Sequence, residues 1–137
     1  MGARSKARKR ALDMLYAADL RGESATDALD RAIAAGEGPT NDYTATLVRG
    51  VVEHVARIDE LLSEFSEGWT LERMPAVDRN VLRLGVWELL YVDDVPDAVA
   101  VSEAAALVRE LSTDDSPSFV NGILGAIQKQ KPTLIQP

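Results

Sequence analysis

Five cationic side chains stand within the first ten residues of this 137-residue chain, with no acid among them. The remaining residues carry ten cations and 22 acids, so the formal net charge of -7 conceals a basic start. Clustered lysine and arginine side chains attract polyanions, and this cluster predicts contacts with RNA phosphates. The alternative interpretation is a solvated tail without a ligand. The five residues are Arg4, Lys6, Arg8, Lys9 and Arg10.

The basic cluster opens a predicted helix from about Ser5 to Leu20, and Gly22 follows it as a stop signal. Cations at a helix N-terminus oppose the helix dipole, so folding alone does not favour them there. Lys9 and Tyr16 are seven residues apart and therefore share a helical face. A phosphate contact and a base-stacking ring could thus lie on one surface. The apolar side of this helix holds Ala11, Leu12, Leu15 and Ala18.

A second candidate segment lies near the C-terminus, where DSPSFVNGILGAI spans residues 115–127. Ser116 is expected to cap a helix, with Pro117 at its first position, where the missing N–H costs nothing. Asp115, Ser116 and Phe119 would then present polar and aromatic groups at the helix start.

Two glycines interrupt this helix at positions 122 and 125, where each costs about 1 kcal/mol relative to alanine. Close packing against another helix is the simpler explanation, because glycine removes the side chain between two backbones.

Signals of enzyme chemistry are poor. The chain has no cysteine, which excludes disulfides and thiolate sites, and it has no phosphate loop or dinucleotide fingerprint. The single histidine, His54, is expected to be packed or solvated. Adjacent acids at 93–94 and 114–115 could bind Mg²⁺, but such pairs in loops more often cap helices. We expect no enzyme, no cofactor and no metal site.

The composition, with 46% hydrophobic and 27% charged residues, is that of a globular protein. No membrane span or signal peptide is recognisable, so a cytoplasmic protein is expected. Apolar residues recur with helical and not strand periodicity, which predicts an all-α fold of about seven helices. A break near 67–76 divides the chain into two helical halves, 1–68 and 69–137, with Trp69 filling the junction.

The helices expected after the first have different strengths of signal. One begins near Ser24, and a long one runs from Thr40 or Asn41 to about Ser66. The helix Val77–Tyr91 is apolar on more than one face, so it is central to a bundle or covered by another protein. A further helix ends at Leu111, and the last seven residues, KPTLIQP, are expected to fray.

Four segments of the chain are distinctive: ARKRALDMLY, AVDRNVLRLGVWELLY, VPDAVAVSEAAAL and LSTDDSPSFVNGIL. Together they resemble the NusB family of bacterial transcription antitermination factors. GWTLERMPAVDR, at 68–79, has an actinobacterial character, and STDDSPSFVNG, at 112–122, is the most characteristic. The match covers nearly the whole chain.

This resemblance implies one all-helical RNA-binding domain over 1–137, made of two packed three-helix-type subdomains. It implies binding to the boxA element of ribosomal RNA leaders together with NusE, a small-subunit ribosomal protein, within the RNA polymerase antitermination complex. By position, the basic start, Tyr16, Asp115, Ser116 and Phe119 map onto the family's RNA-binding residues. The resemblance assigns partner contacts with NusE to Asp78, Arg79, Leu82, Arg83 and Val86.

Two other functions stay open at this point. NusB-like domains are also fused to ribosomal RNA methyltransferases, so the chain could be an RNA-docking piece of an enzyme. It could also be a protein-binding scaffold, because an apolar helix surface can close a homodimer as well as receive NusE.

Overall fold

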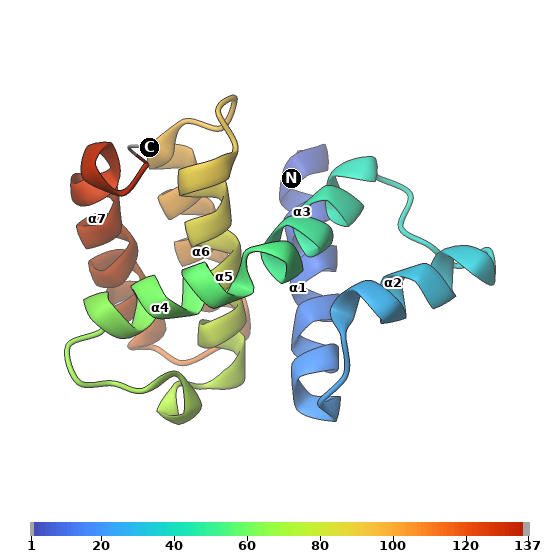
Figure 1. Cartoon of the computed structure of the whole chain (residues 1–137), viewed down its shortest axis with the longest axis horizontal. Helices are drawn as coiled ribbons and strands as arrows, with labels where there is room; N and C mark the ends of the chain where they lie inside the picture. Colours follow the sequence, from blue (N-terminus) through green and yellow to red (C-terminus); the bar gives the residue numbers. More distant parts are fainter. Residues whose placement is uncertain (1, 136–137) are drawn as a thin grey trace. The chain divides into compact units, whose positions relative to one another are not determined.

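The computed structural model describes residues 2–135, which form seven α-helices, one short 3₁₀ helix and no strand. The predicted all-α class is therefore confirmed. None of the described helices is long and apolar enough to cross a membrane. The chain forms two compact units, which divide between His54 and Val55 (Figure 1).

The first unit contains α1 (Ala3–Arg21), α2 (Ala25–Ala34) and α3 (Asp42–Glu53), and each of these helices contacts the other two. Local signals explain the boundaries. Ser24 caps α2 by accepting a hydrogen bond from the Asp27 amide at 3.3 Å, and Asn41 caps α3 by accepting one from the Tyr43 amide at 2.9 Å. Gly22 ends α1 with a φ of 65°, a conformation that glycine adopts readily. The shared core includes Leu12, Leu15, Leu29, Leu47 and Val48.

Two side-chain hydrogen bonds join α3 to the start of α1. Thr44 is buried, and its Oγ1 donates to the carbonyl of Ala7 at 3.2 Å. Asn41 Nδ2 donates to the carbonyl of Ala3 at 3.2 Å. The N-terminal end of α1, which carries the cationic cluster, is therefore held against the N-terminal end of α3.

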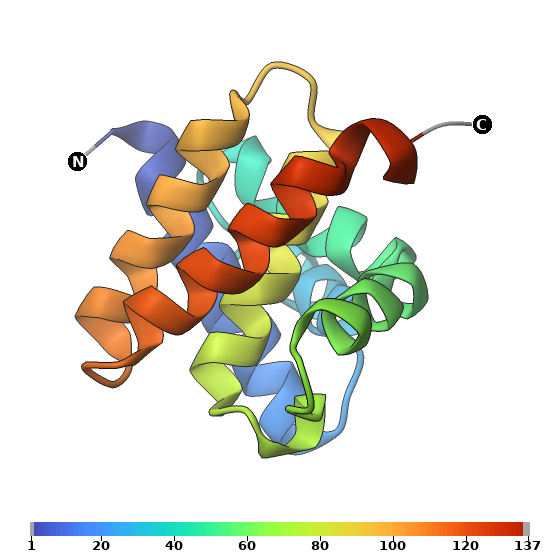
Figure 2. The same ribbon diagram turned by 90° about the vertical axis from the view of Figure 1, so that its left-hand side faces the viewer.

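The second unit contains α4 (Val55–Phe65), the 3₁₀ helix η1 (Leu71–Arg73), α5 (Ala76–Tyr91), α6 (Asp97–Leu111) and α7 (Ser116–Leu134). Helix α5 contacts α4, α6 and α7, which explains why it carries apolar residues on more than one face. Helices α6 and α7 lie side by side along much of their lengths (Figure 2). Gly85 permits the close approach of α5 to α7, because a Cβ there would lie 2.6 Å from Leu124 Cδ1.

The prediction of one long helix to about Ser66 is wrong. Helix α3 ends at Glu53, His54 has φ of -109° and ψ of 14°, and α4 begins at Val55. Helix α3 packs on α1 and α2, whereas α4 packs on α5 and α7, so one apolar stripe serves two cores. Periodicity reports an apolar face but not what covers it.

Two other boundaries differ from expectation. The compact units divide before α4, and the turn signals near 67–76 mark a connection inside the second unit. At the other end, α7 continues through Pro132 to Leu134, so residues 131–134 are helical and not frayed. Positions 136 and 137, also expected to fray, lie outside the described residues.

Candidate nucleic-acid interface

The five cations of the basic start do not share one environment. Arg4, Lys6 and Arg10 are exposed and Lys9 is half-buried. Arg8 is only 4% exposed, and its guanidinium carbon lies 5.9 Å from the centroid of the Tyr43 ring. Arg8 therefore offers little surface to an RNA phosphate, although the sequence predicted a phosphate contact for it as for its cationic neighbours.

Tyr43, at the start of α3, is an aromatic residue that the sequence did not single out. Arg4 lies over its ring, with 4.3 Å between the guanidinium carbon and the ring centroid. Such a cation–π contact orients a charged side chain without neutralising it. No local signal links these two residues, because their proximity depends on the packing of α1 against α3.

Lys6 and Arg10 line a cavity of about 440 Å³ within the first unit. We call this cavity the cationic groove. Its opposite wall is the segment 38–41 that leads into α3. Two cations facing a wall with hydroxyl and amide groups form a surface that suits a phosphate of an RNA backbone. The remaining lining residues are Ala3, Ala7 and Thr44.

Tyr16 lies on the same helix as Lys9, since α1 is continuous from Ala3 to Arg21. Both side chains are half-buried, so each keeps part of its surface accessible. The helical structure therefore preserves the shared face that the spacing predicted, and the stacking role of Tyr16 stays a prediction.

Asp115, Ser116 and Phe119 lie at the start of α7 in the second unit, with different exposures. Asp115 is exposed, Phe119 is half-buried and Ser116 is 1% exposed. The expectation that Ser116 caps α7 is wrong, because Asp115 occupies the N-cap position and makes no side-chain cap hydrogen bond. Ser116 is the first residue of α7 and is buried, so it offers almost no surface to RNA.

Ser116 instead joins a buried hydrogen-bond network. Its Oγ accepts from the Thr113 amide at 3.2 Å and donates to Ser112 Oγ at 3.1 Å. Ser112 Oγ in turn donates to Asp78 Oδ1 at 2.6 Å. This network fixes the 112–116 loop to the start of α5.

A cavity of about 210 Å³ opens beside this network, and we call it the aromatic notch. Phe119 forms one wall, and the Trp69 ring lies edge-on to it with 6.1 Å between centroids and 69° between planes. Trp69 is 53% exposed, so it does not fill the junction expected of it. The notch is also lined by Pro75, Asp78, Thr113, Asp115 and Ser116.

The residues expected to bind NusE mostly hold the second unit together. Leu82 and Val86 are fully buried and Asp78 is 2% exposed, so none of the three offers a free surface in this conformation. Arg79 donates to the carbonyls of Leu71 and Met74 at 2.9 and 3.3 Å. These burials correct the expected partner surface, because apolar spacing alone does not distinguish a core face from a docking face.

Arg83, the fifth expected partner residue, binds Asp59 of α4 through two hydrogen bonds. Its Nε donates to Oδ1 at 2.9 Å and its Nη2 donates to Oδ2 at 3.1 Å. This paired geometry matches the planar guanidinium to one carboxylate, and the remaining nitrogen, Nη1, donates to Asn80 Oδ1 at 3.2 Å.

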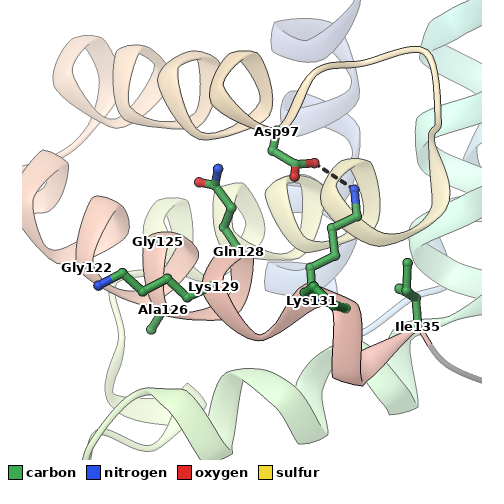
Figure 3. A pocket seen from close by; sticks show the side chains of 9 residues that line it. Asp97, Gly122, Gly125, Ala126, Gln128, Lys129, Lys131 and Ile135 are labelled. Atoms are coloured by element: carbon green, nitrogen blue, oxygen red, sulfur yellow. Dashed lines mark hydrogen bonds and ion pairs between the residues drawn. The ribbon is translucent and has the colours of Figure 1, made fainter.

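The two glycines of α7 do not pack against a helix, contrary to the simpler expectation. A Cβ at Gly122 or Gly125 would meet no atom within 4 Å. Both residues instead border a cavity of about 810 Å³ on the exposed side of α7, where Lys131 Nζ donates to Asp97 Oδ1 at 2.7 Å (Figure 3). This cavity contains none of the predicted site residues. Across residues 2–135, no group of three or more histidines or acids gathers to hold a metal ion.

An all-helical chain with a cationic groove in one unit and an aromatic notch in the other has the features of a nucleic-acid-binding protein. The family model described as NusB family matches residues 5–129. The chain belongs to the NusB family.

Relatives and solved structures agree with this family. The chain is 81% identical over 134 residues to the transcription antitermination protein NusB of Nocardioides sp. JS614, covering 98% of this chain and 99% of that protein. It is 32% identical to T. maritima NusB, with a TM-score of 0.84 and coverage of 98% and 96%. A structure of the antitermination factors NusB and NusE in complex with dsRNA matches with 31% identity, a TM-score of 0.79 and coverage of 92% and 96%.

Proposed function

We propose that this protein is an RNA-binding transcription antitermination factor. It recognises the boxA element of ribosomal RNA leader transcripts together with NusE and promotes transcription of ribosomal RNA by RNA polymerase in the bacterial cytoplasm. Family membership over residues 5–129 is the observation that carries this proposal. Both units, over the whole of 1–137, take part as one RNA-binding domain.

The groups on the protein suit this function. Lys6 and Arg10 in the cationic groove, with Arg4 and Lys9 nearby on α1, bind RNA phosphates. Tyr16, Phe119 and Asp115 contact bases. Arg8 and Ser116 support these groups from buried positions. The NusE contact surface excludes Asp78, Leu82 and Val86, because none of the three is accessible.

The proposal is tested by RNA mobility-shift titrations that compare boxA RNA with a scrambled RNA of equal length, with and without NusE. We expect tighter binding to boxA, and a larger preference when NusE is present. Equal affinity for both RNAs under both conditions would reduce the interaction to charge attraction and would overturn boxA recognition.

A charge-reversed variant, Lys6→Glu/Arg10→Glu, tests whether the cationic groove carries the binding. A matched control is Arg57→Glu/Arg109→Glu, which changes the net charge equally at exposed positions of α4 and α6. Loss of boxA binding in the first variant only supports the groove. An equal loss in both would show that total charge, and not the groove, determines affinity.

A further inference from the structure

Trp69 is an exposed aromatic residue that no core packing explains. More than half of its surface is accessible, at 53%, although a tryptophan side chain gains much from burial. Its only described ring neighbour is Phe119, which it meets edge-on at 6.1 Å. More than half of the Trp69 surface is therefore available for contact with a ligand.

The loop before α5 holds Trp69 in place. Ser66 is buried, and its Oγ donates to the carbonyl of Trp69 at 2.6 Å, while the Trp69 amide donates to the carbonyl of Ser66 at 3.2 Å. Between them Gly68 has a φ of 92°, which side chains disfavour. This turn fixes the backbone at Trp69 before any ligand binds, which lowers the ordering cost of binding.

The charged groups of the aromatic notch are two carboxylates, which accept hydrogen bonds from N–H donors. Asp115 is exposed at its edge, and Asp78 lies deeper with Oδ1 already accepting from Ser112. Carboxylates repel a phosphate but accept from the amino group of a base. Aromatic rings stack on the flat face of any base. The charge and shape of the notch therefore suit a nucleobase and oppose the sugar–phosphate backbone.

We propose that the aromatic notch receives one unstacked base of the bound RNA, with Trp69 as its stacking platform and Asp115 as the acceptor that selects its edge. This inference rests on the proposed RNA-binding function and adds Trp69 as a specificity-determining residue. Bases with an exocyclic amino group, namely guanine, adenine and cytosine, offer Asp115 a donor. Uracil is disfavoured, because its single N–H donor lies between two carbonyl oxygens that face the carboxylate.

The decisive experiment is a double-substitution cycle between protein and RNA, measured with NusE present. Single abasic sites are placed at each position of boxA RNA, and affinities are compared for wild type and Trp69→Ala. We expect Trp69→Ala to lower the affinity for intact RNA by roughly 5- to 150-fold, which corresponds to the free energy of one base–aromatic stack. At one position, which we call the coupled position, removal of the base should weaken RNA binding by the wild type but not by Trp69→Ala.

Three variants make this result specific. Trp69→Phe keeps a ring and should retain most of the affinity, whereas Ile135→Ala removes an equally exposed apolar residue, at 52%, and should change nothing. At the coupled position, uridine should bind more weakly than the amino-bearing bases, and Asp115→Ala should reduce that difference. Circular dichroism and thermal unfolding establish that each variant is folded.

A fluorescence measurement does not depend on an alanine variant. The protein has two tryptophans, and Trp87 is 7% exposed, so Trp87→Phe leaves Trp69 as the single reporter. Stacking predicts quenching of this signal by boxA RNA, and an abasic site at the coupled position should abolish the quenching.

The outcomes separate the two proposals. Lys6→Glu/Arg10→Glu could lose RNA binding while Trp69→Ala keeps normal affinity and shows no coupled position. In that case the assignment of a base to the notch is wrong and the proposed function stands. If wild type does not distinguish boxA from scrambled RNA, the proposed function fails. If Trp69→Ala no longer binds NusE but binds RNA normally in its absence, a protein occupies the notch and the inference is overturned.

Discussion

Asp78 of α5 accepts a hydrogen bond from Ser112, with 2.6 Å between Oδ1 and Oγ, although these residues lie on opposite sides of α6 in the sequence. Asp78 is 2% exposed. A carboxylate that is removed from water requires such a partner, and loss of a hydrogen bond to a charged group typically costs about 1.5–3 kcal/mol. This contact anchors the loop that begins α7.

The first prediction concerns this contact. Asp78→Ala should lower the free energy of unfolding by about 2–3 kcal/mol, because Ser112 and its neighbours lose their charged acceptor. Ser112→Ala should also destabilise, since it leaves the carboxylate buried without that donor. Urea unfolding followed by circular dichroism measures both changes. Asp115→Ala, at an exposed position of the same notch, is the control and should stay within about 0.5 kcal/mol of wild type. Unchanged stability in Asp78→Ala would show that the network does not hold the loop.

The second prediction concerns the paired hydrogen bonds between Arg83 and Asp59. Arg83→Lys keeps the charge but replaces the planar fork, so it should lower the unfolding free energy by about 1 kcal/mol or more. The pair is part-buried, with side chains 16% and 29% exposed, so the effect exceeds that of a surface pair. Arg57→Lys on α4, whose partner Glu60 is exposed, provides the comparison. Equal stabilities of the two variants would contradict the assigned geometry.

The third prediction concerns two glycines in neighbouring helices. Gly85→Ala should destabilise the protein by about 1–3 kcal/mol, because its Cβ would lie 2.6 Å from Leu124 Cδ1 in a packed core. Gly122→Ala should instead stabilise it by up to about 1 kcal/mol, since that Cβ meets nothing within 4 Å and alanine favours a helix. Thermal unfolding compares the two directly. Destabilisation by Gly122→Ala would indicate a packing role that the structure does not contain.

The fourth prediction concerns the salt dependence of RNA binding. Arg4, Lys6, Lys9 and Arg10 are exposed or half-buried. If each of the four contacts a phosphate of single-stranded RNA, the logarithm of the affinity should fall with the logarithm of the salt concentration with a slope of roughly -2.8. Neutralising two of them, in Lys6→Ala/Arg10→Ala, should reduce the magnitude by about 1.4. Titrations of the protein without NusE over a salt series measure this slope. Arg8→Ala should leave the slope nearly unchanged, because Arg8 is buried. A decrease of about 0.7 in the magnitude of the slope would show instead that Arg8 contacts a phosphate.

Local chemistry along the chain is enough to predict the all-helical class, most helix boundaries and the family. The caps at Ser24 and Asn41, the stop at Gly22 and the apolar periodicity depend on neighbours within a few residues. The characteristic segment at 112–122 also acts as a local signal, and the family match over 5–129 confirms what it indicated.

Only tertiary packing decided which faces these helices use. Arg8 and Lys6 look equivalent in sequence, yet one is buried and the other lines the cationic groove. Leu82 and Val86 suited a docking face and lie in the interior instead. The apolar run through His54 gave no sign that it divides between two cores.

The same reason explains the aromatic notch. Trp69 precedes α5 and Phe119 belongs to α7, so no local pattern predicts that their rings meet at 6.1 Å. A sequence determines the preferences of short segments through interactions a few residues long. The surfaces that meet RNA depend on contacts between distant segments, which form only when the helices pack.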